Sequence, residues 1–186
     1  MGNKELLVIE TKHLVLRPFI MRDVDDVFEY ASDSGWVRYL VNIPQPFTLK
    51  EAEEFVRRLS DLKSWDAFPM FAIVFKGKVI GEVYLNDMNL QNEHAELGYD
   101  LSRVYWGESL ATEVAGAVID WAFQTYNLKK VYSTCDPRNN RSIRVMEKLG
   151  MSQEGRLRNH LKWNGESKDV MYSSILCHEW LSSCEK

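Results

Sequence analysis

The stretch YWGESLATE at residues 105–113 joins a strand-like segment, HAELGYDL at 94–101, to a long amphipathic segment from Leu110 to Tyr126. A turn of small residues that feeds directly into such a segment predicts the start of a helix. The first N–H groups of a helix lack partners within it, and the helix dipole adds partial positive charge at that end. The stretch therefore predicts a turn that can bind a phosphate group.

A second unit of turn and helix, DPRNNRSIRVMEKLGM, follows at residues 136–151. Its end, Gly150 followed by Met151, is typical of a Schellman ending, in which a left-handed glycine closes the helix and an apolar residue comes next. Two such units in this order restrict the fold far more than either one alone.

Further elements can be assigned outward from these two units. Thr48 and Glu51 fit a capping box at the start of a helix, while Gly77 and the pair Asn164-Gly165 mark the turns of two hairpins. Gly98, inside a strand, predicts a bulge or a close backbone approach. The predicted strands are 13–19, 71–75, 79–85, 94–101, 131–135, 157–163 and 169–176, and the predicted helices are 23–32, one from residue 48, 110–126 and 139–149. This order predicts one α/β domain, residues 1–186, with mixed strand directions.

The composition is that of an ordinary soluble domain. The 186 residues suffice for one sizeable core, and the formal net charge of −4 gives no basic excess for binding nucleic acid. No apolar run approaches the ~20 residues of a membrane span. The three cysteines, Cys135, Cys177 and Cys184, have neither CxxC spacing nor a zinc framework. We therefore expect a cytoplasmic protein that holds no metal and binds neither nucleic acid nor a membrane.

Three stretches together carry a resemblance to a known family. They are LVLRP at 14–18, ELGY at 96–99 with WGESLATE at 106–113, and DPRNNRS at 136–142 with EKLGM at 147–151. In order and spacing they resemble the GNAT superfamily of acyl-CoA-dependent N-acetyltransferases, most closely its RimJ/RimL branch of ribosomal-protein N-terminal acetyltransferases. The resemblance covers roughly residues 9–180. It implies a single α/β (α+β) GNAT-like domain, with a mixed, mostly antiparallel central sheet of about six to seven strands flanked by about four helices.

The resemblance also implies the cosubstrate and the residues that hold it. Acetyl-CoA would bind without a metal, its diphosphate held by the amides around residues 105–111 and its pantetheine arm contacted by Asn139 and Ser142. The expected cofactor-binding residues are Leu97, Tyr99, Trp106, Gly107, Glu108, Ser109, Leu110, Ala111, Asn139 and Ser142. Asn139 and Ser142 also suit a helix start, so each has a structural role open to it.

Several positions depart from the superfamily's pattern. Ser109 stands where the turn usually has glycine, and the residue before it, often basic, is Glu108. If the site needs a positive φ or a very close phosphate, the Cβ of Ser109 is unfavourable. We therefore expect acetyl-CoA binding that is weakened but retained. Met146 occupies the position at which many members carry a tyrosine that acts as general acid, and methionine cannot donate a proton.

The reaction requires an amine to lose a proton, attack a thioester carbonyl and release a thiolate. Glu82 and Glu96 are the candidates for the base, each with the alternative of closing an internal hydrogen bond or facing solvent. A backbone N–H near residues 97–99 could polarise the carbonyl oxygen, and Ser142 could contact the sulfur. An α-amino group, with a pKa near 8, needs a weaker base than an alkyl amine with a pKa of about 10.4.

The sequence defines the acceptor less well. The resemblance implies that two parts of the chain flank the acceptor pocket: the segment between the first two helices, and the C-terminal hairpin. The candidate wall residues of this pocket are Trp36, Tyr39, Phe47 and Trp163. Three hypotheses stay open. The first, which we favour, is transfer to a protein or peptide N-terminus. The second is transfer to a small amine such as a polyamine, an amino acid or an aminoglycoside, and the third is binding of acyl-CoA without catalysis. A homodimer is compatible with all three.

Overall fold

The computed structural model describes residues 7–40, 43–61, 68–163 and 165–184. Within them the chain forms one eight-stranded sheet in the spatial order β1-β2-β3-β4-β5-β6-β8-β7. The strands are β1 (Ile9–Glu10), β2 (Val15–Arg17), β3 (Met70–Phe75), β4 (Lys78–Asn89), β5 (His94–Leu101), β6 (Lys130–Cys135), β7 (Ser152–Trp163) and β8 (Glu166–Leu176). Neighbouring strands are antiparallel, apart from β5 and β6, which run parallel. The predicted fold class is confirmed.

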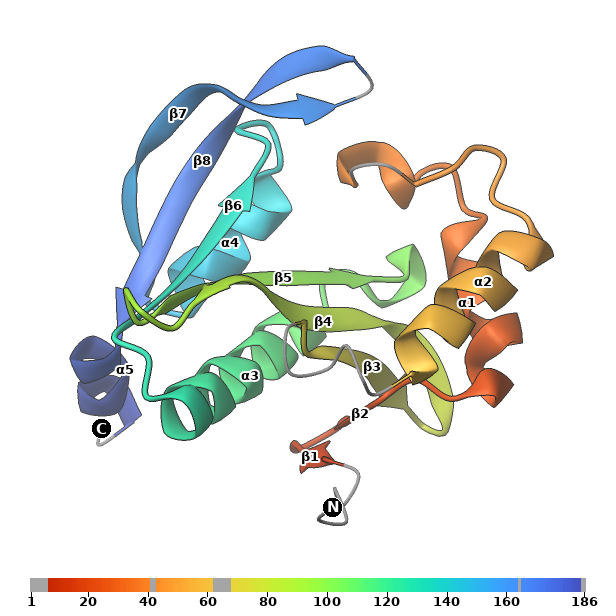
Figure 1. Ribbon diagram of the computed structural model, residues 1–186, viewed down its shortest axis with the longest axis horizontal. Helices are drawn as coiled ribbons and strands as arrows, with labels where there is room; N and C mark the ends of the chain where they lie inside the picture. Colours follow the sequence, from red (N-terminus) through yellow and green to blue (C-terminus); the bar gives the residue numbers. More distant parts are fainter. Residues whose placement is uncertain (1–6, 41–42, 62–67, 164, 185–186) are drawn as a thin grey trace.

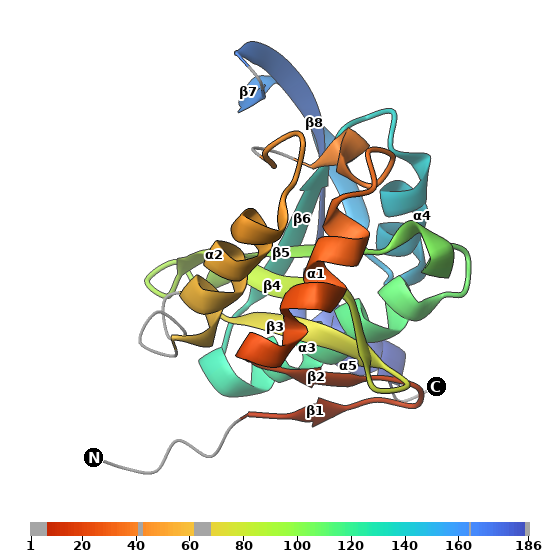
Figure 2. The ribbon, with the colours of Figure 1, turned by 90° about the vertical axis from the view of Figure 1, so that its right-hand side faces the viewer.

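Helices cover both faces of the sheet (Figures 1 and 2). On one face lie α1 (Val24–Ala31) and α2 (Leu49–Ser60), and on the other lie α3 (Leu110–Tyr126), α4 (Asn140–Lys148) and α5 (Cys177–Cys184); short 3₁₀ turns occupy Met21–Asp23, Val37–Tyr39 and Arg103–Tyr105. Side chains alternate between the two faces along each strand, so a strand contributes residues to the hydrophobic core on each face of the sheet. In β3, Phe71 and Ile73 pack with α3, whereas Met70 and Ala72 pack with α1 and α2. None of the described helices has the length and apolar composition needed to cross a membrane.

Strands β5 and β6 separate soon after they begin. They pair only over residues 94–96 of β5 and 130–132 of β6. Beyond that point β6 continues alongside β8, while β5 runs on to residue 101 beside β4. Figure 1 shows the two strands diverging. Among the described strands, none pairs with the other edge of β5 over residues 97–101.

Local signals in the sequence set the ends of two helices. The Thr48 hydroxyl accepts a hydrogen bond from the N–H of Glu51 at 3.4 Å, and the Glu51 carboxylate accepts one from the N–H of Thr48, which confirms the capping box of α2. After α4, Gly150 has φ +75°, and the N–H of Met151 donates to the carbonyl of Met146 at 3.0 Å. This bond pattern confirms the Schellman ending.

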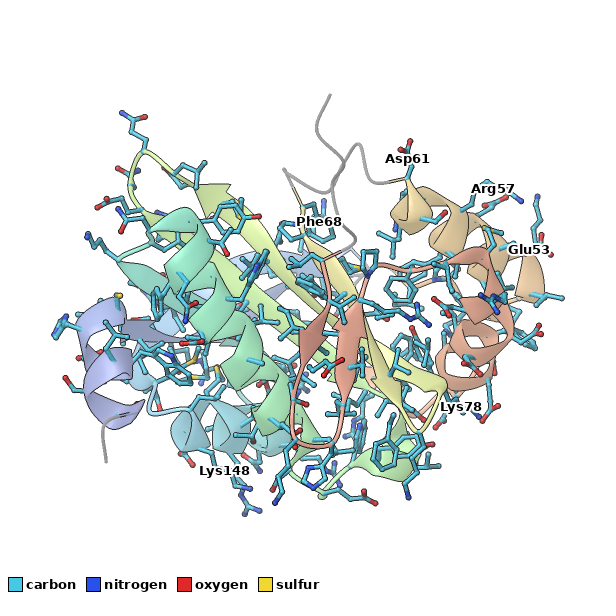
Figure 3. The ribbon with its side chains drawn as sticks, turned by 90° about the horizontal axis from the view of Figure 1, so that it is seen from below. Glu53, Arg57, Asp61, Phe68, Lys78 and Lys148 are labelled. Atoms are coloured by element: carbon cyan, nitrogen blue, oxygen red, sulfur yellow. The ribbon has the colours of Figure 1, made fainter. Side chains whose placement is uncertain are left out.

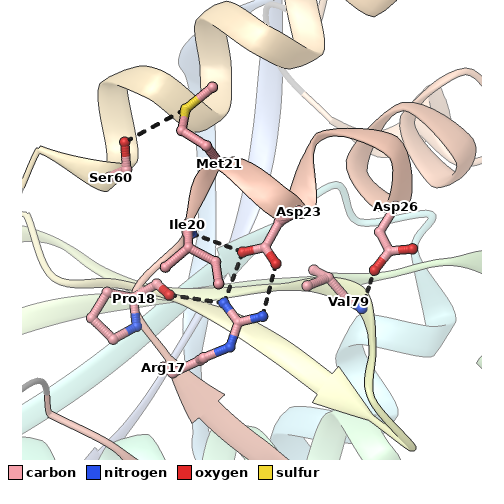
Figure 4. A network of polar contacts seen from close by, with 8 residues as sticks. All are labelled: Arg17, Pro18, Ile20, Met21, Asp23, Asp26, Ser60 and Val79. Carbon is pink, nitrogen blue, oxygen red and sulfur yellow. Dashed lines mark hydrogen bonds and ion pairs between the residues drawn. The ribbon is translucent and has the colours of Figure 1, made fainter.

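An ion pair fixes the passage from β2 into α1 (Figure 4). The Arg17 guanidinium donates two hydrogen bonds of 2.7 Å to the carboxylate of Asp23. Asp26 then accepts a hydrogen bond from the N–H of Val79 at 2.8 Å, which ties α1 to β4. These contacts hold α1 where the hydroxyl of its Tyr30 reaches the sheet.

The structure differs from the sequence-based prediction in a few places. The prediction lacks β1 and α5, because a two-residue strand and an eight-residue helix show too little periodicity. No bulge occurs at Gly98, which pairs regularly with Tyr84; the irregularity between β4 and β5 lies between Asn86 and Asn89. The close contact at Gly98 is with a side chain, since an added Cβ would meet the Tyr84 ring at 2.3 Å. The turn type predicted for Asn164-Gly165 depends on residue 164, which is outside the described residues.

Candidate active site

A cavity of about 840 Å³ lies where β5 and β6 separate. Its lining comes from one face of β4, residues 96–101 of β5, the end of β6, the turn before α3, the length of α4, the region between α1 and β3, and the β7–β8 hairpin. Phe68 and Lys148, both lining residues, lie on opposite sides of the molecule in Figure 3. The lining therefore includes residues that are well separated in this view.

The turn before α3 leaves a set of backbone N–H groups free. The hydrogen bonds of the helix begin with the N–H of Glu113, which donates to the carbonyl of Ser109 at 3.1 Å. In the described part of the chain, no protein atom accepts a hydrogen bond from the amides of 107–112. Gly107 and Ser109 have φ of +89° and +62°, so both are left-handed, and the Ser109 side chain does not cap the helix. The N-terminus of α3 can therefore bind an anion through its own amides.

Basic side chains of α4 surround this turn. Those that line the cavity are Arg141, Arg144 and Lys148. The guanidinium carbon of Arg141 lies 4.8 Å from the centre of the Trp106 ring, and the ammonium of Lys148 donates to the hydroxyl of Ser109 at 3.2 Å. The indole N–H of Trp106 donates to the carbonyl of Leu101 at 2.7 Å and so holds the turn against the end of β5. This end of the cavity combines free amides with positive charge, which suits a phosphate.

The middle of the cavity lies between the open edge of β5 and the start of α4. The hydroxyl oxygens of Tyr99 and Ser142 are 3.1 Å apart. The Asn139 side chain accepts a hydrogen bond from the N–H of Ser142 at 3.3 Å, so Asn139 caps α4. Met146 is buried in the core and lies outside the cavity lining. Burial raises the pKa of Cys135, beside Ser142, to about 11, so this residue stays a neutral thiol.

Two carboxyl groups meet in the wall formed by β4 and β5. Glu82 and Asp100 lie directly opposite each other in the strand register, and we call them the carboxyl pair. The Tyr30 hydroxyl donates to the Glu82 carboxylate at 2.6 Å, and Glu82 is only 5% exposed. Oδ1 of Asp100 and Nε1 of Trp36 are both buried without a hydrogen bond of good geometry. The carboxyl pair therefore has a buried oxygen, Oδ1 of Asp100, that is available to hydrogen-bond a bound substrate.

Burial controls the protonation of the carboxyl pair. It raises the pKa of Glu82 to about 7, against the opposing effect of hydrogen bonds from Tyr30 and Asp100. Burial and the charge of Glu82 raise the pKa of Asp100 well above its usual range, although the nearby Trp36 indole acts in the other direction. Two acids this close favour one shared proton. Around neutral pH the carboxyl pair can therefore hold one proton and one negative charge.

Glu96, the second predicted base, has a different environment. Its carboxylate accepts a hydrogen bond from the Thr134 hydroxyl at 2.6 Å. Burial raises the pKa of Glu96, although the Thr134 hydrogen bond opposes this rise. Glu96 lies on the same face of β5 as Asp100, four residues or about 13 Å away along the strand. The face therefore carries two separate acidic positions.

The structure brings nearly all of the predicted site residues to the cavity. Those in its lining are Glu82, Glu96, Leu97, Tyr99, Trp106, Gly107, Ser109, Leu110, Ala111, Asn139 and Ser142. Glu108 is exposed and lies outside the lining. Of the residues expected to line the acceptor pocket, Trp36 lines the cavity, whereas Phe47 is buried in the core and does not. The side chains of Tyr39 and Trp163 lie outside the described residues.

Sequence reasoning missed two members of the site. Asp100 alternates onto the same strand face as Glu96, but only the register between β4 and β5 places it opposite Glu82. Tyr30 reaches Glu82 from α1, 52 positions away in the chain. No local pattern could connect these residues. No cluster of three or more His, Cys, Asp or Glu side chains among the described residues could hold a metal ion.

Comparison with known proteins identifies the family. A model of the acetyltransferase (GNAT) domain matches residues 13–152. The chain belongs to the GNAT acetyltransferase family. The "Uncharacterized N-acetyltransferase p20" of Bacillus licheniformis is 34% identical to it over 173 residues, which cover 91% of this chain and 96% of that protein. This GNAT chain is therefore an N-acetyltransferase that uses acetyl-CoA, rather than a binding module without catalysis.

Other relatives of this GNAT acetyltransferase carry different acceptors in their names. Spermidine N(1)-acetyltransferase of Escherichia coli (strain K12) is 27% identical over 167 residues, covering 90% of this chain and 88% of that protein. The "Putative ribosomal N-acetyltransferase YdaF" of Bacillus subtilis (strain 168) is 25% identical over 176 residues, covering 91% and 94%. A solved GNAT-family acetyltransferase from Bacillus anthracis matches with a TM-score of 0.80 and 27% identity, covering 91% of this chain and 98% of that one. The reaction class is common to these names, and the acceptor is not.

Proposed function

We propose that this GNAT acetyltransferase belongs to the RimJ/RimL-like branch and acetylates the α-amino group of a peptide or protein N-terminus. The observation that carries the proposal is the carboxyl pair, Glu82 and Asp100, in the cavity wall. An α-ammonium with a pKa near 8 loses its proton readily to a base with a pKa of about 7, whereas an alkyl ammonium with a pKa of about 10.4 does so much less readily. This match of pKa values favours an N-terminal amine.

The turn before α3 and the open edge of β5 suit acetyl-CoA. The free amides of 107–112 and the basic side chains of α4 would hold its phosphates. The edge of β5 over residues 97–101 would bind the amide groups of the pantetheine arm as a neighbouring strand would. Bound there, acetyl-CoA supplies an acetyl group already activated as a thioester.

Different residues of the cavity then take part in proton transfer, in stabilising the carbonyl oxygen and in release of the sulfur. Glu82 receives the proton of the substrate ammonium, and Asp100 holds Glu82 in place by donating its own proton in a hydrogen bond. A backbone N–H at 97–99 stabilises the charge that develops on the carbonyl oxygen. The neutral amine attacks the thioester carbonyl, so a C–N bond forms and the C–S bond breaks. Ser142, held by Tyr99, donates a hydrogen bond to the departing sulfur, and the second proton of the amine passes to that thiolate through solvent. Holding two substrates in this geometry provides most of the acceleration.

The pH dependence of kcat/KM tests the assignment of the base. With a peptide substrate, kcat/KM should fall as the pH drops through about 7, because protonated Glu82 cannot accept a proton. Glu82→Gln should lower kcat/KM by roughly 10²–10⁴-fold and remove this limb. In Glu82→Gln only the neutral amine can react, so kcat/KM should instead rise as the pH passes the substrate's own pKa near 8.

Glu96→Gln is the matched control for this experiment. It removes a carboxylate from the same cavity face but leaves the carboxyl pair, so the limb near pH 7 should persist. Loss of the limb in Glu96→Gln, together with its retention in Glu82→Gln, would assign the base to Glu96 instead.

A polyamine is the second candidate acceptor. Glu96 and the carboxyl pair provide two acidic positions about 13 Å apart on one strand face, a distance that an extended polyamine can span. The relationship to a spermidine acetyltransferase points the same way. A higher kcat/KM for spermidine than for every peptide of a panel, reduced by Glu96→Gln, would select this acceptor.

We also propose that the enzyme works in the cytoplasm, which the free thiols of Cys135 and Cys177 support. A homodimer is the oligomeric state that we would test first, by sedimentation at several protein concentrations.

A further inference from the structure

Five apolar side chains line the part of the cavity formed between α1 and β3. They are Leu40, Ile43, Phe55, Phe68 and Met70, and we call them the apolar wall. Met70 is 7% exposed, while the other four are half-buried, so they keep surface that faces the cavity. All five belong to or pack against the core formed with α1 and α2. The apolar wall is therefore held in place by the hydrophobic core behind it.

The apolar wall adjoins the carboxyl pair. Met70 lies opposite Tyr84 in the register of β3 and β4, and Tyr84 follows Glu82 by two residues on the same face. The Phe68 and Tyr84 ring centres are 5.5 Å apart. A group bound at Glu82 thus has the rings of Tyr84 and Phe68 as its next neighbours along the cavity.

The chemistry of the wall discriminates between amine acceptors. The apolar wall contributes no charged or hydrogen-bonding side chain. A second ammonium group placed against it would lose its hydration without gaining a partner. An apolar side chain placed there would instead leave water for apolar contact. The wall therefore fits an acceptor with one charged amine next to an apolar group.

We propose that the acceptor is a peptide whose first residue carries a large apolar side chain, such as leucine, methionine or phenylalanine. Its α-amino group lies against the carboxyl pair, and its side chain lies against the apolar wall. This inference rests on the proposed function, since it specifies which N-terminus the enzyme acetylates.

A series of peptides that differ only in their first residue tests the inference. We expect kcat/KM for leucine, methionine and phenylalanine peptides to exceed that for alanine and serine peptides by at least about tenfold, in line with the discrimination of apolar pockets. Equal or higher values for alanine or serine would overturn the inference but leave N-terminal acetylation standing. Turnover of spermidine alone would instead overturn the proposed function. A kcat/KM for leucine amide equal to that for the leucine peptide would overturn the assignment of a peptide.

Variants of the apolar wall locate the selectivity. Leu40→Ala and Ile43→Ala should each lower the ratio of kcat/KM for leucine over alanine peptides by at least about threefold. Because the ratio is taken within one variant, a loss of folded enzyme cancels. Leu90→Ala, at an apolar position that is 58% exposed and outside the cavity lining, is the control and should keep the wild-type ratio. Wild-type ratios in both wall variants would overturn the placement of the side chain.

Discussion

Ser109 departs from the family pattern and adopts a backbone conformation that glycine favours. The superfamily's glycine allows a left-handed backbone, and Ser109 adopts that same conformation, with φ +62°. A left-handed residue with a Cβ costs about 1–2 kcal/mol. Its hydroxyl accepts a hydrogen bond from Lys148, one of the basic residues in the cavity lining. The serine is therefore strained in the turn that we assign to the phosphates.

Ser109→Gly should bind acetyl-CoA as tightly as the wild type or more tightly, because it removes a Cβ from the turn. Its free energy of unfolding should stay within about 1 kcal/mol of wild type, because relief of strain is offset by the greater freedom of unfolded glycine. Titration calorimetry and urea denaturation measure both quantities. Ser109→Ala, which keeps the Cβ and loses the hydroxyl, is the control. A clear loss of affinity in both variants would show that the hydroxyl itself contacts the cosubstrate.

Among the elements, α2 links a local sequence signal to the candidate acceptor site. Its start is fixed by the capping box of Thr48 and Glu51, and it carries Phe55 of the apolar wall. Ala52 and Val56 on the same helix are fully buried against the sheet. The position of the wall therefore depends on a helix whose first turn is held by side-chain hydrogen bonds.

Thr48→Ala should lower the free energy of unfolding by about 1 kcal/mol, because the N–H of Glu51 loses its acceptor at the helix start. Thr48→Ser keeps the hydroxyl and should retain most of the wild-type value. Chemical denaturation of the three proteins at one pH provides the comparison. Equal losses in the alanine and serine variants would mean that packing of the threonine methyl group, and not the cap, is responsible.

At the scale of the whole molecule, the sheet is interrupted where β5 and β6 separate, and part of one edge of β5 is left without a neighbouring strand among the described residues. Residues 97–101 of β5 lack a neighbouring strand on that side within the described chain, and the amides at the start of α3 face the same cavity. Acetyl-CoA bound there would bridge β5, α3 and α4. We therefore expect the cosubstrate to stabilise the domain as a unit.

Acetyl-CoA at about 100 times its Kd should add about 2.7 kcal/mol to the free energy of unfolding. For a domain of this size, this corresponds to a rise in Tm of roughly 5–10 °C. Scanning calorimetry measures the shift, and Lys148→Ala should reduce it because a cation of the cavity is lost. Arg57→Ala, on α2 and outside this cavity, is the control. A Tm unchanged by saturating acetyl-CoA would remove the cavity as its binding site.

The sequence by itself determined the helix ends, the position of the turn before α3 and the order of most elements, because the signals for these lie in short stretches of neighbouring residues. The cap at Thr48 and the left-handed Gly150 are of this kind. The tertiary structure alone decided which acids lie side by side. Glu82 and Asp100 lie opposite each other because of the register of β4 and β5. The hydroxyl of Tyr30, on α1 and 52 positions before Glu82, donates a hydrogen bond to Glu82. Strand register and burial are set by the packing of the whole chain, so no short stretch of sequence records them.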